Sequence, residues 1–154
     1  GALLCYTNQN LHHYDLDLKY DHVKLEQRIK VCAVVMHQVC HRFNDGEQAF
    51  TPKDIHEVTK IPQQIINHAV KDLLQARLLV EIRRGEKGSF EESIILHPIE
   101  KIDHLTYGAM IERLFTYGAD VVGLAEQNLD GEKWKDIDVL NAEFVEKGKN
   151  INFV

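Results

Sequence analysis

The nine histidines are the residues of this sequence best suited to chemistry, because imidazole binds metals and transfers protons near neutral pH. His37 and His41 are one helical turn apart beside Cys40, so a helix would present both rings on one face, as a zinc pair requires. Gln38, however, stands where the H-E-x-x-H motif has glutamate, and the sequence offers no obvious third ligand. We therefore predict no metal site and no cofactor.

Acid–base cleavage of RNA would need two histidines that converge on one phosphate, aided by a lysine. The histidines are spread along the chain, and HPIEKIDH (residues 97–104) has the letters of an H-x-H-x-D-H nuclease motif without its spacing. RGEKGSF (residues 84–90) lacks the Lys-Ser/Thr pair of a P-loop. The sequence therefore predicts no catalytic residue, and a tRNA-processing ribonuclease remains only as a second alternative.

The elements that would position these residues begin with an amphipathic helix between His22 and Phe43. Its apolar residues recur at intervals of three and four, which is the spacing of one helix face. They are Leu25, Ile29, Cys32, Met36, Val39, Cys40 and Phe43. Because the three cysteines are odd in number and form no C-x-x-C pair, Cys32 and Cys40 are expected to be buried, reduced thiols.

A helix-turn-helix and a hairpin are predicted next. Thr51, Pro52 and Asp54 have the pattern of a helix start with a capping box. Pro62 opens a second helix, over residues 62–79. Strands at residues 78–84 and 93–98 flank a loop with two glycines. A further helix is expected over residues 103–118.

This order predicts a mainly α fold with a small β-hairpin, namely a winged helix-turn-helix with additional flanking helices. Residues 1–20 would form an exit and linker, residues 21–118 the winged-helix domain, and residues 119–154 an acidic C-terminal extension with eight acids and four bases. In the extension, Trp134 is expected to anchor one segment on the domain, and the far end to fray.

A winged helix suggests contact with nucleic acid through its second helix and its wing. The candidate surface is Gln63, Gln64, Asn67, His68, Lys71, Arg83, Arg84 and Lys87. Gln and Asn can read adenine, but phosphate contacts need an excess of Lys and Arg. Residues 51–97 hold seven bases and seven acids, and the whole chain carries a net charge of −6. We therefore expect nucleic acid to be an unlikely partner, with a DNA-binding transcriptional regulator as the alternative.

Several short stretches resemble one membrane-protein family. They are Gly1-Ala2, Gln9-Asn10 and Tyr14 at the start, then Phe43, Gly46-Glu47, Thr51, Ile61-Pro62 and LTYGAMIERLFTYG (residues 105–118). Together they resemble the YihY/BrkB family of inner-membrane proteins, in particular the soluble C-terminal domain of its Bacteroidetes-type members. Leu3 replaces a glutamate of that family's pattern, and the glycine usual before the first wing strand is absent near Ala76-Arg77.

The resemblance implies a cytoplasmic domain that follows the last transmembrane helix of a full-length inner-membrane protein. Its partner would be the membrane-spanning part of the same protein, and its role would be regulation or assembly without catalysis of its own. Self-association through the winged helix or the Leu105–Phe115 helix is compatible with the sequence. These residues contain no catalytic motif that would support the family's older name, ribonuclease BN.

Overall fold

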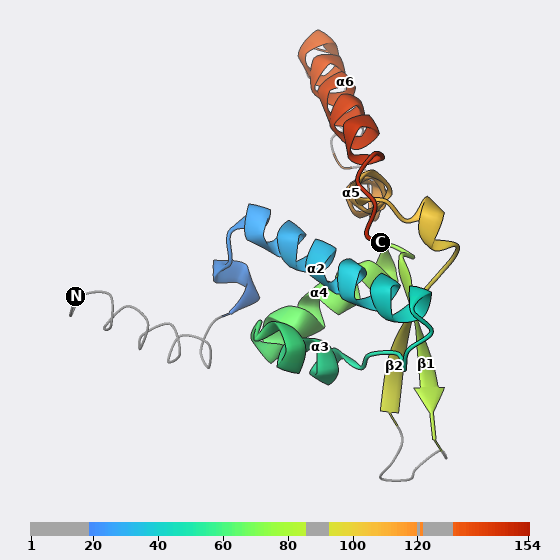
Figure 1. The fold of residues 1–154 in the computed structure, drawn as a ribbon. Coiled ribbons are helices and arrows are strands. Elements are labelled where there is room, and N and C mark those ends of the chain that lie inside the picture. Colours follow the sequence, from blue (N-terminus) through green and yellow to red (C-terminus); the bar gives the residue numbers. More distant parts are fainter. Residues whose placement is uncertain (1–18, 86–92, 120, 122–130) are drawn as a thin grey trace, which may run out of the picture.

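The computed structural model describes residues 19–85, 93–119, 121 and 131–154. Its elements are η1 (Tyr20–His22), α2 (Leu25–Asn44), α3 (Pro52–Thr59), α4 (Gln63–Gln75), β1 (Leu79–Arg84), β2 (Ser93–Pro98), η2 (Ile102–His104), α5 (Tyr107–Thr116) and α6 (Gly131–Gly148) (Figure 1). The described chain is mainly helical with one two-stranded antiparallel hairpin. This confirms the predicted fold class, a winged helix-turn-helix with flanking helices.

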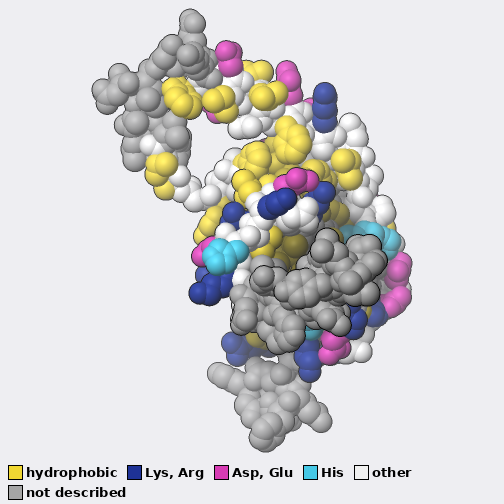
Figure 2. Space-filling model, turned by 90° about the vertical axis from the view of Figure 1, so that its left-hand side faces the viewer, with side chains coloured by type: hydrophobic (Ala, Val, Ile, Leu, Met, Phe, Trp, Pro, Cys, Tyr) yellow, Lys and Arg dark blue, Asp and Glu magenta, His cyan; other side chains and the backbone are white. Residues whose placement is uncertain are grey.

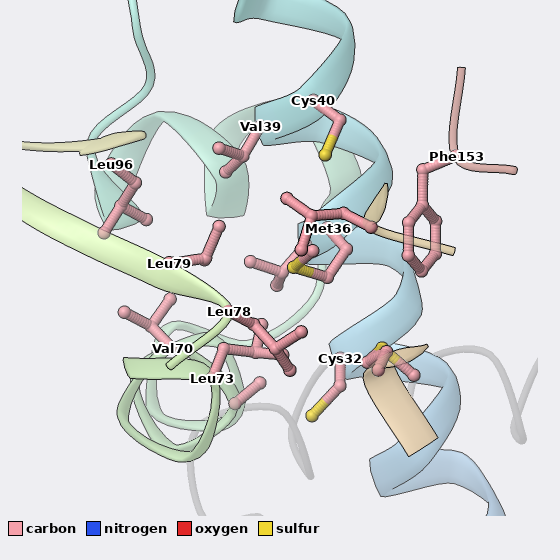
Figure 3. Packing of buried hydrophobic residues seen from close by; sticks show 14 of the residues in the cluster. Cys32, Met36, Val39, Cys40, Val70, Leu73, Leu78, Leu79, Leu96 and Phe153 are labelled. Carbon is pink, nitrogen blue, oxygen red and sulfur yellow. The ribbon is translucent and has the colours of Figure 1, made fainter. Parts of the chain in front are cut away.

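The core lies between α2, α4 and the base of the hairpin. The α2 residues Cys32, Met36, Val39 and Cys40 lie in one buried cluster with Val70, Leu73, Leu78, Leu79 and Leu96 (Figure 3). The two ends of the predicted apolar face lie outside the core: Leu25 is 64% exposed and Phe43 is 52% exposed. The helix starts at Leu25 and not at His22, because residues 20–22 form a separate 3₁₀ turn.

The start of α3 follows the predicted capping chemistry. The Thr51 hydroxyl accepts from the Asp54 backbone N–H at 3.1 Å, and the Asp54 carboxylate accepts from the Thr51 N–H at 2.9 Å. Pro52 occupies the first turn. Lys60, with φ of 62°, ends the helix in the left-handed region, so a three-residue turn joins α3 to α4.

The second helix of the pair is shorter than predicted, because it ends at Gln75 and not at Leu79. Arg77 adopts a left-handed φ of 57°, and its carbonyl accepts from the Arg113 guanidinium at 2.9 Å. An arginine therefore makes the turn for which a glycine is the usual choice. The turn brings Leu78 and Leu79 into the core.

The hairpin pairs Leu79 with Pro98 at its base and Arg84 with Ser93 toward its tip. The Leu96 backbone N–H also donates to the Phe50 carbonyl at 2.9 Å, which ties β2 to the segment that precedes α3. Since β1 and β2 alternate their side chains, Leu79 and Leu96 face the core.

The C-terminal end of the chain returns to the winged helix. Phe153 is buried, and its carbonyl accepts from the His37 Nδ1–H at 2.8 Å. The Tyr107 N–H donates to the Ile151 carbonyl at 2.8 Å. The anchor of this segment is therefore Phe153 and not Trp134, which is 37% exposed. The far end, which the sequence predicts to fray, makes these contacts in the structure.

In the ranges that the structure describes, no helix combines the length and the apolar character needed to cross a membrane. Of the expected exit and linker, residues 1–20, residues 1–18 lie outside these ranges, and Tyr20 belongs to η1.

Candidate nucleic-acid interface

The outer face of α4 is polar and carries no carboxylate at its exposed positions. Gln64, Asn67, His68 and Lys71 are exposed, whereas Ile65, Ile66, Ala69, Val70 and Leu73 are buried. Gln63 is half-buried, and its amide donates to the Asn67 side-chain oxygen at 2.9 Å. This hydrogen bond orients the Asn67 amide on the exposed face of α4.

The other flank of α4 is covered by η1. The Tyr20 ring stacks on His68 with centroids 4.6 Å apart and an interplanar angle of 8°. The Tyr20 hydroxyl donates to the Asp72 carboxylate at 2.8 Å. Burial and this hydrogen bond raise the pKa of Tyr20, so the phenol stays protonated. Tyr20 is not among the residues that the sequence predicts for this surface. Its partners, Asp72 and His68, are about fifty residues away along the chain, and no local sequence pattern predicts these contacts.

The wing contributes two arginines next to each other in sequence. Arg83 and Arg84 are exposed on β1, and alternation along the strand directs them to opposite faces of the hairpin. Arg84 lines a shallow groove with Ile95, His97 and residues 46–49. Lys87, the third wing candidate, lies outside the described residues.

The carboxylates counted against DNA binding are not equivalent in space. Asp54 is occupied by the capping box of α3, and Asp72 is turned toward Tyr20. Glu81 lines a groove with Asn67 and Lys71 beside α4. The balance of seven bases and seven acids over residues 51–97 therefore does not describe the α4 face itself, where Lys71 is the charged exposed residue.

The histidine pair on α2 does not flank a space for a phosphodiester. The His37 and His41 rings pack edge to face with their centroids 4.2 Å apart. The His37 Nδ1–H donates a hydrogen bond to the Phe153 carbonyl. The described residues contain no group of three or more His, Cys, Asp and Glu side chains that could hold a metal ion. The geometry thus gives no support to RNA cleavage at this pair.

The two α2 thiols are buried and free, as the sequence predicts. Burial, with a smaller effect of Asp72, raises the pKa of Cys32 to about 12. Burial alone raises the pKa of Cys40 to about 11. Both are neutral thiols at physiological pH and pack as small apolar groups.

The helix pair, the hairpin and the exposed polar face together define a winged-helix protein. No family model and no curated protein matches the chain. Among solved structures, the chain is similar to CymR (YrzC), the global cysteine regulator of B. subtilis. The sequences are 14% identical, the match covers 85% of this chain and 93% of that chain, and the TM-score is 0.55.

This comparison overturns the resemblance to the YihY/BrkB family, which is wrong. Three of the matching residues are ones that the turns of such a fold need: Thr51 caps α3, and Gly46 and Gly118 have φ of 66° and 102°. Short cap motifs of this kind recur wherever the same turns are made.

The predictions that rested on that resemblance fail for the same reason. The prediction of a regulatory or assembly domain of a membrane protein, with the membrane-spanning part of the same protein as its partner, is therefore wrong. The expected inner-membrane location loses its support as well. The prediction that nucleic acid is an unlikely partner is also wrong, since a solved structure with this fold is that of a regulator. That prediction failed because it counted charges along the sequence and not over one face.

Proposed function

We propose that this chain is a DNA-binding transcriptional regulator that inserts α4 into the major groove. The observation that carries the proposal is the polar, carboxylate-free exposed face of α4, beside a wing with two arginines. A regulator with the same fold supports it. Helix-turn-helix proteins place the N-terminal part of the second helix against base edges, and here that part carries Gln64, Asn67 and His68.

Each exposed group has a role that follows from its chemistry. Gln64 and Asn67 can each donate to and accept from an adenine edge. Lys71 and the wing arginines supply the positive charge that phosphates require. The neutral side chains on α4 would then choose the sequence, while the cations would fix the register on the duplex.

Selection from a pool of randomised duplexes tests the proposal, followed by fluorescence anisotropy on the enriched duplex. Binding should weaken steeply as salt rises from about 50 mM to about 200 mM. The double variant Gln64→Ala/Asn67→Ala should lose preference for the selected sequence but keep salt-dependent binding. A chain that enriches no sequence and binds no duplex at about 50 mM salt would contradict the proposal.

We also propose that the DNA-binding unit is a homodimer formed through α6. This helix contacts α5 near its C-terminal end, where Val145 and Gly148 are at least partly buried. Farther toward its N-terminus, Ile137, Leu140 and Phe144 form an apolar stripe with exposures of 46%, 65% and 49%. Figure 2 shows hydrophobic side chains gathered along this helix at the top of the view. A stripe of this kind on an extended helix is typical of a helix–helix interface.

The partner that fits this stripe is a second copy in antiparallel orientation. With Leu140 at the centre, Ile137 of each copy faces Phe144 of the other. Asp136 and Lys147 lie on one flank of the stripe about three turns apart, so the antiparallel arrangement brings the acid of one copy near the base of the other. Residues 21–118 would then be the DNA-binding unit, and the extension of residues 119–154 would carry the pairing helix. The Leu105–Phe115 helix is not the interface that we propose, because Leu105, Met110 and Ile111 are buried.

A further inference from the structure

A cavity of about 380 Å³ lies between η1, the first half of α2, the end of α4 and α5. Its apolar wall is formed by Leu25, Ile29, Leu114, Phe115 and Tyr117, and its polar wall by Tyr20, Arg28, Asp72 and Gln75, with the Cys32 thiol between them. The volume is within the range of small-molecule sites, which are mostly apolar with a few convergent polar groups.

Two opposite charges face this cavity without pairing with each other. The Arg28 Nε is buried and has no hydrogen-bond partner in the part of the chain that the structure describes. The Arg28 guanidinium lies 5.2 Å from the centre of the Tyr20 ring. Asp72 accepts a hydrogen bond from the Tyr20 hydroxyl, and its carboxylate has further lone pairs for a second donor. A buried donor without a partner is costly, which points to a ligand that satisfies it.

We propose that this cavity binds an apolar α-amino acid, with Arg28 holding its carboxylate and Asp72 its ammonium group. A purely anionic ligand would be repelled by Asp72, and a purely cationic one by Arg28. A zwitterion meets both charges at once, and its side chain can lie against Leu114 and Phe115.

The same residues connect the cavity to the DNA-reading face, so this part of the inference rests on the proposed function. Tyr20 lines the cavity, donates to Asp72 and stacks on His68. An ammonium group that binds the remaining lone pairs of Asp72 draws negative charge away from the hydrogen bond with the Tyr20 hydroxyl and weakens it. Binding therefore shifts Tyr20 and the exposed His68 ring against it, and the amino acid becomes an effector of DNA affinity.

Isothermal titration calorimetry without DNA tests the binding part. L-Phenylalanine, L-leucine and L-methionine serve as probes, at concentrations up to about 10 mM. At least one should bind saturably. For L-phenylalanine, the two control ligands are phenylpropionate, which lacks the ammonium group, and phenylethylamine, which lacks the carboxylate. Each should bind about tenfold more weakly or worse, because each loses one charge-assisted contact.

Variants assign the two contacts. Arg28→Gln should weaken the binding of the amino acid and of phenylpropionate, but the affinity for phenylethylamine should stay the same or rise. Asp72→Asn should weaken the binding of the amino acid and of phenylethylamine, but the affinity for phenylpropionate should stay the same or rise. The matched controls are Lys30→Gln and Asp103→Asn, which remove the same charges from exposed sites outside the cavity. Circular dichroism establishes that each variant is folded. Absence of saturable binding by all three amino acids, or equal affinity for the single-charge analogues, would overturn the proposal.

Anisotropy with the selected duplex tests the regulatory part. Saturating amino acid should change the DNA dissociation constant by about fivefold or more, and Arg28→Gln should abolish that change. An amino acid that binds in calorimetry but leaves DNA affinity unaltered would overturn the regulatory role. If no duplex is selected at all, the proposed function fails, while the calorimetry still decides the ligand site.

Discussion

Gly108 of α5 lies backbone to backbone against Gly148 at the end of α6. A Cβ atom on Gly148 would be 2.8 Å from the Gly108 Cα, and one on Gly108 would be 2.3 Å from the Val145 carbonyl oxygen. Both separations are shorter than van der Waals contact. The crossing of these two helices therefore depends on glycine at both positions, and it fixes α6 on the winged helix.

The first prediction concerns this crossing. Gly108→Ala should destabilise the protein by about 1–3 kcal/mol, because the new methyl group must push the α6 backbone away. Urea unfolding followed by circular dichroism measures the change. Asp138→Ala, at an exposed position of α6, should change the stability by less than about 0.5 kcal/mol. Equal stability of Gly108→Ala and the wild type would show that the crossing is looser than described.

The second prediction concerns the α6 stripe. Leu140→Glu should convert the dimer to a monomer, because it places a carboxylate on the dimer axis close to its symmetry mate. Light scattering coupled to size exclusion measures the mass. Val139→Glu introduces the same charge at a site that is 58% exposed but lies on another side of the helix, so this variant should remain dimeric. A wild-type chain that is monomeric at high concentration would refute the α6 interface.

The third prediction concerns Lys71 on the proposed DNA-reading face. Lys71→Ala should weaken the binding of all duplexes to a similar extent. It should also reduce the slope of log K against log salt by about 1, as expected for one lost phosphate contact. Anisotropy titrations at several salt concentrations measure the slope. Lys101→Ala serves as the control, because Lys101 is exposed on the loop before η2, away from α4. An unchanged slope for Lys71→Ala would place the phosphates elsewhere.

The fourth prediction concerns the left-handed turn between α4 and β1. Arg77→Gly should stabilise the protein, or at worst leave it unchanged, with a gain of up to about 1 kcal/mol. The reason is that the φ of 57° costs a side-chain-bearing residue about 1 kcal/mol or more and costs glycine nothing. Gln75→Gly, two residues earlier and still helical, should instead destabilise by about 1 kcal/mol. Thermal unfolding of both variants decides this; destabilisation by both would contradict it.

The fifth prediction concerns pH. Since the folded state raises the pKa of Cys32 to about 12 and that of Cys40 to about 11, the unfolded chain ionises these thiols first, near pH 8.5. Their contribution is fully present below that pH and is lost as pH rises toward the folded pKa values. The free energy of unfolding should therefore fall between about pH 8.5 and pH 10, at up to about 1.4 kcal/mol per pH unit for each thiol.

Urea titrations at several pH values measure this slope. The Cys32→Ala/Cys40→Ala variant starts less stable because of the cavities it creates, but its slope over the same interval should be flatter. In a Cys5→Ser background, iodoacetamide should react with the thiols only as fast as the protein opens. An identical slope in the double variant, or rapid alkylation of the folded protein, would contradict the burial of these thiols.

The sequence by itself determined the elements whose signals are local. Thr51, Pro52 and Asp54 lie within four residues of one another and specify the start of α3 by direct hydrogen bonds. The burial of Cys32 and Cys40 and the exposed face of α4 follow from helical periodicity. Cap and turn residues are common to many winged helices, however, which is why matching them to one membrane-protein family misled.

The tertiary structure alone decided which distant residues meet. Tyr20 meets Asp72 and His37 meets the Phe153 carbonyl, although these partners are 52 and 116 residues apart. The sequence pattern did not predict the apolar stripe of α6, because Asn141 interrupts it and Val139 lies outside it. Periodicity reports which side of a helix is apolar, but the identity of its partner is set by long-range packing. Glu81 of β1 lines the groove beside Asn67 and Lys71, but α4 itself exposes no carboxylate. For the same reason, charge counted along the chain could not show this, nor that Asp54 and Asp72 make their hydrogen bonds elsewhere.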